Sequence, residues 1–290
     1  MVSGRSPQLS PRLVKHLLWL GTCCLWASAC ARFGGRDAGL RLSDTVVRDQ
    51  LIVTSSFQLP KQHRLIEELA AQRGDLTAKL ALPTSDEPIR VYLFDTPENF
   101  NRYVHQHYPG FPTRRAFFVE TDTQLAVYAH WGDRLAEDLR HEVAHGYLHA
   151  VVPNLPLWLD EGIAEYFEVP RGHRGLNRPH VDAIAARIAG GAWHPDLRRL
   201  ETMTSASDME QLDYAESWAW IHLLMETEPE RLNLLREYLA ILRRDAMAPP
   251  MSNFIRQALP NAEDALIAHI RELAADPAAN QATEQLTESR

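Results

Sequence analysis

The hydrophobic and polar positions predict strands in the first half of the chain and helices in the second. Ile89 to Phe94 is a short apolar run typical of a buried strand, and two similar runs, 116–119 and 125–128, flank a polar turn. The segment from Thr96 to Tyr108 has helical spacing. From Asp133 onward, apolar residues recur at the helical period. Strands followed by helices predict an α+β fold.

The N-terminal segment has the pattern of an export signal. Three basic residues precede an apolar run from Leu17 to Ala29, which is shorter than the roughly 18 residues of a membrane-spanning helix. The run ends in small residues followed by Cys30, which suits either an ordinary signal peptidase or lipid attachment at Cys30. We therefore expect export to a bacterial cell envelope, with the protein anchored by a lipid at Cys30 or otherwise freely periplasmic or secreted.

The flanks of the chain lack hydrophobic periodicity. The segment after Cys30 is rich in Gly and Arg, and the last residues are polar. These boundaries predict a signal peptide of lipoprotein type, a tether, a folded domain and a disordered tail: 1–29, 30–44, 45–275 and 276–290.

Composition narrows the possible functions. The 290 residues are 45% apolar, enough for a sizeable core, and the net charge is −8. This charge argues against a general nucleic-acid binder, because it cannot neutralise a phosphate backbone. The three cysteines all lie within the first 30 residues, so disulfides do not organise the fold.

The segment His141-Glu142-Val143-Ala144-His145 is an H-E-x-x-H motif. An apolar stripe places it on a helix, so that His141 and His145 project from one face about 6 Å apart and can share one ion. Glu142 lies about 100° around that helix, where it can face a water and accept its proton. Two chance histidines on a buried helix are the alternative reading of this motif.

A catalytic zinc needs a third protein ligand. His149 lies eight residues after His141, about 12 Å along the same helix, which is too far to share the ion. The next helix carries Glu161 and Glu165 on one face, where two like charges favour a positive partner opposite. A carboxylate from this helix is therefore the predicted ligand, and a pair of solvated surface glutamates is the alternative.

The pair HEVAH and LPLWLDEGIAEYFE resembles the gluzincin branch of the zincin metallopeptidases, the peptidase MA-like superfamily. The motifs cover residues 141–168, with a weaker similarity of layout from about 49 to 245. The resemblance implies a zincin-like fold: a small mixed sheet with N-terminal helices, an active-site helix carrying H-E-x-x-H, and a helical C-terminal lobe. The substrate-amine motif of the large aminopeptidases has no counterpart here, so their specificity is not implied.

The resemblance also implies residue roles. His141, His145 and Glu161 would bind one zinc ion per chain, Glu142 would be the general base, and Glu165 would orient a ligand histidine. The strand before the motif helix, residues 123–128, would receive the substrate backbone along the cleft edge.

Gluzincins also take a Tyr or His downstream of the motif as an oxyanion donor, and Tyr214 is the candidate. The equally weighted alternative for Tyr214 is a core aromatic residue. Three histidines of the intervening segment compete with it for this role: His173, His180 and His194.

The sequence thus predicts an exported zinc-dependent peptidase that hydrolyses peptide bonds of a peptide or protein substrate. A catalytically silent zincin-like scaffold or peptide-binding module is the first alternative, and a zinc hydrolase of non-peptide amides is the second. The intact Glu142 argues against a silent protein. The sequence does not indicate an oligomeric state or a cleavage specificity.

Overall fold

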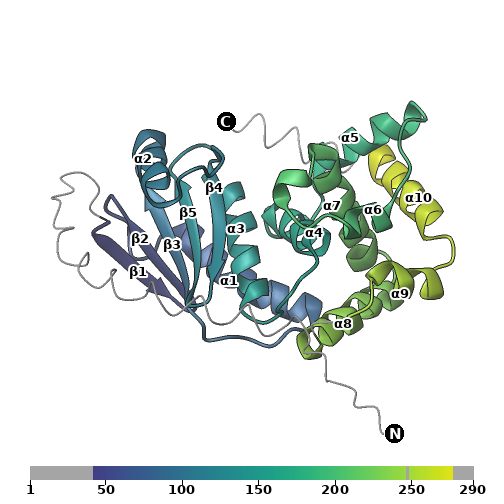
Figure 1. Cartoon of the computed structure of the whole chain (residues 1–290), viewed down its shortest axis with the longest axis horizontal. Helices are drawn as coiled ribbons and strands as arrows, with labels where there is room; N and C mark the ends of the chain where they lie inside the picture. The colour runs from purple at the N-terminus through teal and green to yellow at the C-terminus, as the bar shows by residue number, and fades with distance from the viewer. Residues whose placement is uncertain (1–41, 246–247, 277–290) are drawn as a thin grey trace, which may run out of the picture. The chain divides into compact units, whose positions relative to one another are not determined.

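The computed structural model describes residues 42–245 and 248–276 (Figure 1). A five-stranded mixed sheet occupies the N-terminal half, with the strand order β1-β2-β3-β5-β4. Its strands are β1 (Asp44–Arg48), β2 (Leu51–Ser55), β3 (Ile89–Phe94), β4 (Ala116–Thr121) and β5 (Gln124–His130). Strands β2, β3 and β5 run parallel, and β1 and β4 pair antiparallel at the two edges.

Helices occur between the strands and make up most of the second half. The sheet region contains α1 (Arg64–Leu80) and α2 (Pro97–His107). The remaining helices are α3 (Leu135–His149), α4 (Leu157–Glu168), α5 (Arg178–Ala189), α6 (Leu197–Glu201), α7 (Gln211–Glu226), α8 (Pro229–Arg244), α9 (Met251–Ala258) and α10 (Ala262–Ala275). A single 3₁₀ turn, η1 (Ala206–Asp208), precedes α7. The predicted α+β class is confirmed.

The two faces of the sheet carry different packing. Residues of odd number in β3, such as Ile89 and Val91, are buried in the main core, which continues into α1 and α3. Phe94 points to the other face, where it packs against Phe100 of α2 and Tyr103 in a smaller aromatic cluster. Strand periodicity therefore fixes which side of the sheet receives the motif helix α3.

Helices α3 and α4 are joined by a turn that contains Pro153 and Pro156. Helix α4 packs on α3 at one side and on α7 at the other. Gly162 permits the second contact, because an added Cβ would lie 2.6 Å from the carbonyl oxygen of Ser217 in α7.

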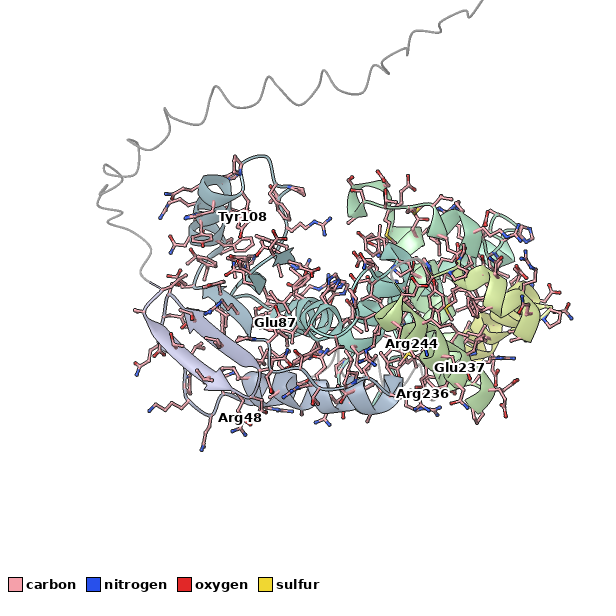
Figure 2. All side chains as sticks on the ribbon, turned by 60° about the horizontal axis from the view of Figure 1, so that its bottom comes forward. Arg48, Glu87, Tyr108, Arg236, Glu237 and Arg244 are labelled. Carbon is pink, nitrogen blue, oxygen red and sulfur yellow. The ribbon has the colours of Figure 1, made fainter. Side chains whose placement is uncertain are left out.

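Charged side chains lie on the outside of these layers. Figure 2 shows Arg48 at the end of edge strand β1 and Glu237 on α8, both exposed. No helix within the described residues is long and apolar enough to cross a membrane. The predicted signal peptide, Cys30 and most of the tail lie outside the described residues.

Candidate metal centre

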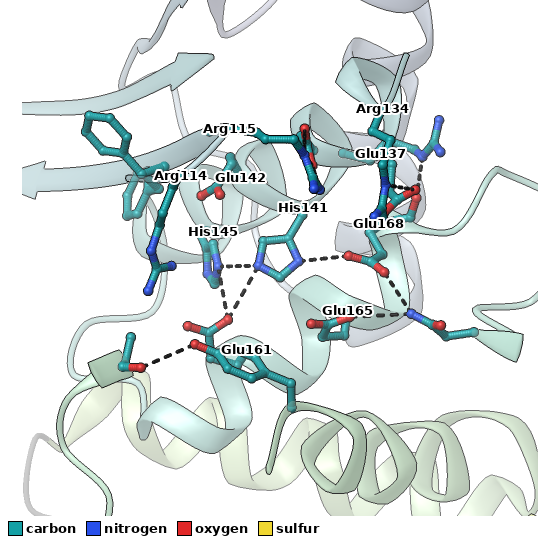
Figure 3. A pocket seen from close by; sticks show the side chains of 18 of the residues that line it. Arg114, Arg115, Arg134, Glu137, His141, Glu142, His145, Glu161, Glu165 and Glu168 are labelled. Atoms are coloured by element: carbon teal, nitrogen blue, oxygen red, sulfur yellow. Dashed lines mark hydrogen bonds and ion pairs between the residues drawn. The ribbon is translucent and has the colours of Figure 1, made fainter. Parts of the chain in front are cut away.

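The site forms where α3 crosses α4. Leu139 and Val143 are fully buried against the sheet, which leaves the neighbouring face of α3 for the two histidines. His141 is half-buried, His145 is buried, and both face Glu161 of α4 (Figure 3). The three side chains offer atoms within 4.8 Å of one another, so they could hold one metal ion.

The spacing of these atoms suits a tetrahedral ion. His141 Nε2 lies 3.2 Å from His145 Nε2, and Glu161 Oε2 lies 3.4 Å and 3.7 Å from these two nitrogens. Two ligand atoms held at about 2.0–2.1 Å by a tetrahedral zinc are separated by about 3.3–3.4 Å. The observed separations are close to this value without any side-chain rotation.

The other nitrogen of each imidazole faces a carboxylate. His141 Nδ1 lies 3.2 Å from Glu168 Oε2, and His145 Nδ1 lies 2.9 Å from Asp160 Oδ1. An ionised carboxylate only accepts hydrogen bonds, so it favours the tautomer with hydrogen on Nδ1. Both Nε2 atoms then present lone pairs, and these converge with the Glu161 carboxylate on one point. Three hydrogen-bond acceptors in contact need a cation between them. The two imidazoles and the carboxylate therefore fit a bound metal ion.

The same arrangement raises the pKa of both histidines in the metal-free protein. Burial alone would lower the pKa of His141, but hydrogen bonds to Glu161 and Glu168 outweigh it. Burial likewise opposes the charge on His145, and Asp160 reverses the effect. Protons therefore compete with a metal for Nε2, and metal affinity should fall as the pH falls.

Asp160 and Glu168 were not identified from the sequence, and Glu165 is placed differently from the expectation. Glu165 Oε2 accepts a 2.7 Å hydrogen bond from His180 Nε2, not from a histidine of the candidate metal site. The carboxylate that contacts His141 Nδ1 is that of Glu168 instead. The spacing i, i+4, i+7 places Glu168 on the same helix face as Glu161 and Glu165, and this signal could have indicated it.

The alternative of two solvated surface glutamates on α4 is wrong. Glu161 is 8% exposed and Glu165 is 7% exposed, and each has a histidine opposite. Two carboxylates buried at this level require charge partners. The structure supplies partners for both from α3 and α5.

Glu142 lies beside the two histidines and faces the cleft (Figure 3). Burial raises the pKa of its carboxyl group, and the neighbouring His141 and His145 limit the shift. A carboxylate with a raised pKa is a better proton acceptor near neutral pH.

Tyr214 enters the same cleft from α7. Its hydroxyl group donates a 3.4 Å hydrogen bond to the carbonyl oxygen of Ala206. Burial raises the pKa of Tyr214, Glu161 adds to the shift, and the nearby Arg114 opposes it. The hydroxyl group therefore keeps its proton at neutral pH and can act as a donor.

The competing histidines lie in different surroundings. His173 lines the cleft, and His180 lines it while bound to Glu165. His194 lies by a separate, smaller pocket near Trp193. His149 is held by Asp160 at 2.9 Å and Glu120 at 2.6 Å, which agrees with its exclusion as a ligand to an ion shared with His141.

A cleft of about 1560 Å³ contains the candidate metal centre. Its walls come from β4 and the loop before it, from α3 and α4, and from the segments 170–180 and 205–214. The cleft is large enough for several residues of a peptide, because an ordinary small-molecule pocket is about 300–1,000 Å³.

The sheet order corrects the prediction of which strand would receive the substrate backbone. Residues 123–128 fall largely in β5, which is paired with β3 on one side and β4 on the other. Its backbone groups are therefore already used by the ladder. The last strand in the order is β4, and Ala116 and Phe118 of this strand line the cleft. Of the two edge strands of the described sheet, β4 is thus the one that lines the cleft.

Comparison with known proteins did not assign the chain to a family. A scan against protein-family models found no matching family, and a search of curated proteins found no matching sequence. What stands from sequence and structure together is a buried His/Glu group, on a helical H-E-x-x-H segment, that could bind a metal.

Proposed function

We propose that the chain is a zinc-dependent peptidase of gluzincin type, with one zinc ion held by His141, His145 and Glu161. The observation that carries the proposal is the convergence of three acceptor atoms, 3.2–3.7 Å apart, beside the free carboxylate of Glu142. Two imidazoles and one carboxylate are a known set for a catalytic zinc with an open position. The family name rests on the two sequence motifs.

Zinc bound here would act as a Lewis acid toward water and the substrate carbonyl group. Glu142 takes a proton from the attacking water and returns it to the leaving nitrogen of the peptide bond. The Tyr214 hydroxyl group donates a hydrogen bond to the carbonyl oxygen as negative charge develops on it. For this step Tyr214 exchanges its bond to the Ala206 carbonyl group for one to substrate.

The substrate lies as an added strand on the edge of β4. An extended peptide satisfies its backbone groups there, and its side chains point alternately toward and away from the cleft. This places the scissile bond beside Ala116 to Phe118, because Phe118 packs on the ring of His145.

Metal analysis and a base variant test the activity. Purified protein should contain one zinc per chain, and Glu142→Gln should keep this zinc and the circular dichroism spectrum of the wild type. Hydrolysis of a casein or degenerate peptide substrate should fall by about 10²- to 10⁴-fold in the variant, because proton transfer is lost.

Chelation followed by zinc addition should remove and then restore the wild-type activity. A metal-loaded wild type that cleaves no peptide would show instead a silent scaffold or a hydrolase of other amides. Unchanged turnover in Glu142→Gln would contradict the assignment of the base.

We further propose that the protein is exported and anchored by a lipid at Cys30. The basic residues, the short apolar run and the small residues before Cys30 support this reading. The variant Cys30→Ser should move the protein from the membrane fraction to the soluble fraction of a cell lysate. Retention of that variant in the membrane fraction would contradict lipid attachment at this residue.

A further inference from the structure

Arg114 differs from the other arginines that line the cleft. Four of these have carboxylate partners, in the ion pairs Arg115–Asp138, Arg134–Glu137, Arg140–Glu68 and Arg178–Asp182. Within residues 42–245 and 248–276, no ion pair involves Arg114. Its side chain is exposed in the loop just before β4, and it extends into the pocket beside His145 (Figure 3).

Arg114 lines the same cleft as Glu142 and Tyr214. A guanidinium group presents five donors in a planar fork that matches a carboxylate.

The register between β4 and α3 shows which end of a bound peptide reaches Arg114. Arg115, just before β4, pairs with Asp138 near the start of α3. Glu120, near the end of β4, pairs with His149 at the end of α3. The strand and the helix thus run in the same direction, and the metal centre lies between these two contacts.

Antiparallel addition gives the substrate its direction. Strand β4 already pairs antiparallel with β5, and antiparallel pairs are the more frequent in proteins. A peptide added antiparallel runs from the Glu120 end of β4 toward Ala116. The residues that follow the scissile bond then approach the loop that carries Arg114.

We propose that Arg114 is a specificity-determining residue that binds a substrate carboxylate on the C-terminal side of the scissile bond. The inference rests on the proposed peptidase function. Two sources supply this chemistry: the free C-terminus of a peptide cut within one or two residues of its end, and an acidic side chain just after the cut. The first source makes the protein an enzyme that removes short C-terminal fragments.

A matched peptide library tests the proposal. Degenerate N-acetylated hexapeptides are made once with a free C-terminal carboxylate and once as the amide, and cleavage is followed by mass spectrometry. The zinc-loaded wild type should cleave the acid library with a kcat/KM about 10- to 100-fold above the amide library, the range expected for a charged hydrogen-bonded contact. Enrichment of Asp or Glu after the cut in the amide library identifies the side chain as the source.

The variant Arg114→Gln should abolish this preference while its cleavage of neutral amide peptides stays within about threefold of the wild type. Arg114→Lys should keep part of the preference, because the charge remains and the planar fork is lost. Arg102→Gln, at an exposed arginine of α2 that contacts Asn99, is the matched control and should keep the full preference. Zinc content and circular dichroism verify that each variant folds.

Two outcomes would overturn the proposal. One is an equal loss on acid and neutral substrates in Arg114→Gln, which would assign the residue to the reacting atoms. The other is a wild type without any preference for a carboxylate. If the wild type cleaves nothing, the peptidase proposal fails separately, and binding decides: zinc-loaded Glu142→Gln should still bind the acid library more tightly than the amide library, and adding Arg114→Gln should remove the difference.

Discussion

The carboxylates of Asp160 and Glu168 determine which nitrogen each histidine of the site offers. Each lies within 3.2 Å of an Nδ1 atom, so the Nε2 atoms are left facing Glu161. The network continues outward, since Asp160 also accepts a hydrogen bond from His149. Burial opposes the negative charge of Asp160, but the contacts with His145 and His149 hold its pKa well below the usual range.

Removing either carboxylate charge should weaken metal binding. We expect Asp160→Asn and Glu168→Gln each to lower zinc affinity by about 10- to 100-fold, because the imidazole loses its fixed orientation and part of its basicity. Competition with a fluorescent zinc chelator measures the change. Glu165→Gln is the control, since Glu165 contacts His180, and its effect should be smaller. An effect of Glu165→Gln as large as the other two would restore the role that the sequence indicated.

At the scale of single residues, local spacing predicted the part of the site that lies on one helix. His141 and His145 are one turn apart, and that relation is fixed by helix geometry. The contacts of Asp160 depend on the angle at which α4 crosses α3, and no sequence period encodes that angle. Arg114 and Tyr214 come from separate elements, so their proximity becomes visible only in the fold.

Helix α4 is held between α3 and α7, and Gly162 sets the distance between α4 and α7. An added Cβ at this position would meet Ser217 O at 2.6 Å and Ile221 Cγ1 at 2.8 Å. Backbone at this distance cannot move aside without shifting α4 or α7. The position of Glu161, one residue earlier, depends on this contact.

We therefore expect Gly162→Ala to lower the free energy of unfolding by about 1–3 kcal/mol, the range for overpacking a core. Zinc affinity should fall with it, because α4 is displaced. Gly74→Ala in α1 is the matched control, as no atom lies within 4 Å of its added Cβ, and it should stabilise the protein by up to about 1 kcal/mol. Chemical denaturation of both variants measures the difference. Equal effects of the two substitutions would show that helix propensity alone decides.

Helices and strands with a clear hydrophobic period were predicted more accurately than the residues at which they begin and end. The strand predicted over 89–94 has those bounds, whereas the helix predicted from Thr96 to Tyr108 spans Pro97–His107. Thr227 and Glu230 have the spacing of a capping box, but α8 begins at Pro229 after Glu228 and has no side-chain cap. Proline fits the first helical turn without needing a hydrogen bond, so it starts the helix there.

A buried pair of histidines makes the stability of the whole domain depend on pH. His222 Nδ1 and His269 Nε2 lie 2.9 Å apart in the helical part of the core. Burial lowers the pKa of His222 to about 3, and His269 adds to the shift. The unfolded chain takes up a proton near pH 6.5 and the folded protein does so only near pH 3.

The sign follows from proton uptake: between these pH values the unfolded state binds more protons, so stability falls as the pH falls below about 6.5. In the chelated protein, His222→Gln should flatten the acid side of the stability profile by a few kcal/mol, on the order of 1.4 kcal/mol for each pKa unit. Denaturant midpoints from pH 7 to pH 4 measure it. His105→Gln, at an exposed histidine of α2, should leave the profile unchanged. If the stability of His222→Gln falls with pH in parallel with that of the wild type, other groups cause the acid sensitivity.

The three side chains that could hold the ion, together with the carboxylates of Asp160 and Glu168 beside them, belong to one continuous stretch, residues 135–168. Side chains outside this stretch also contact it: Asn177 donates a hydrogen bond to Glu168, and Phe118 packs on the ring of His145. The set of metal-binding groups is thus local in the sequence, while the surroundings that hold these groups in place are supplied by the rest of the fold.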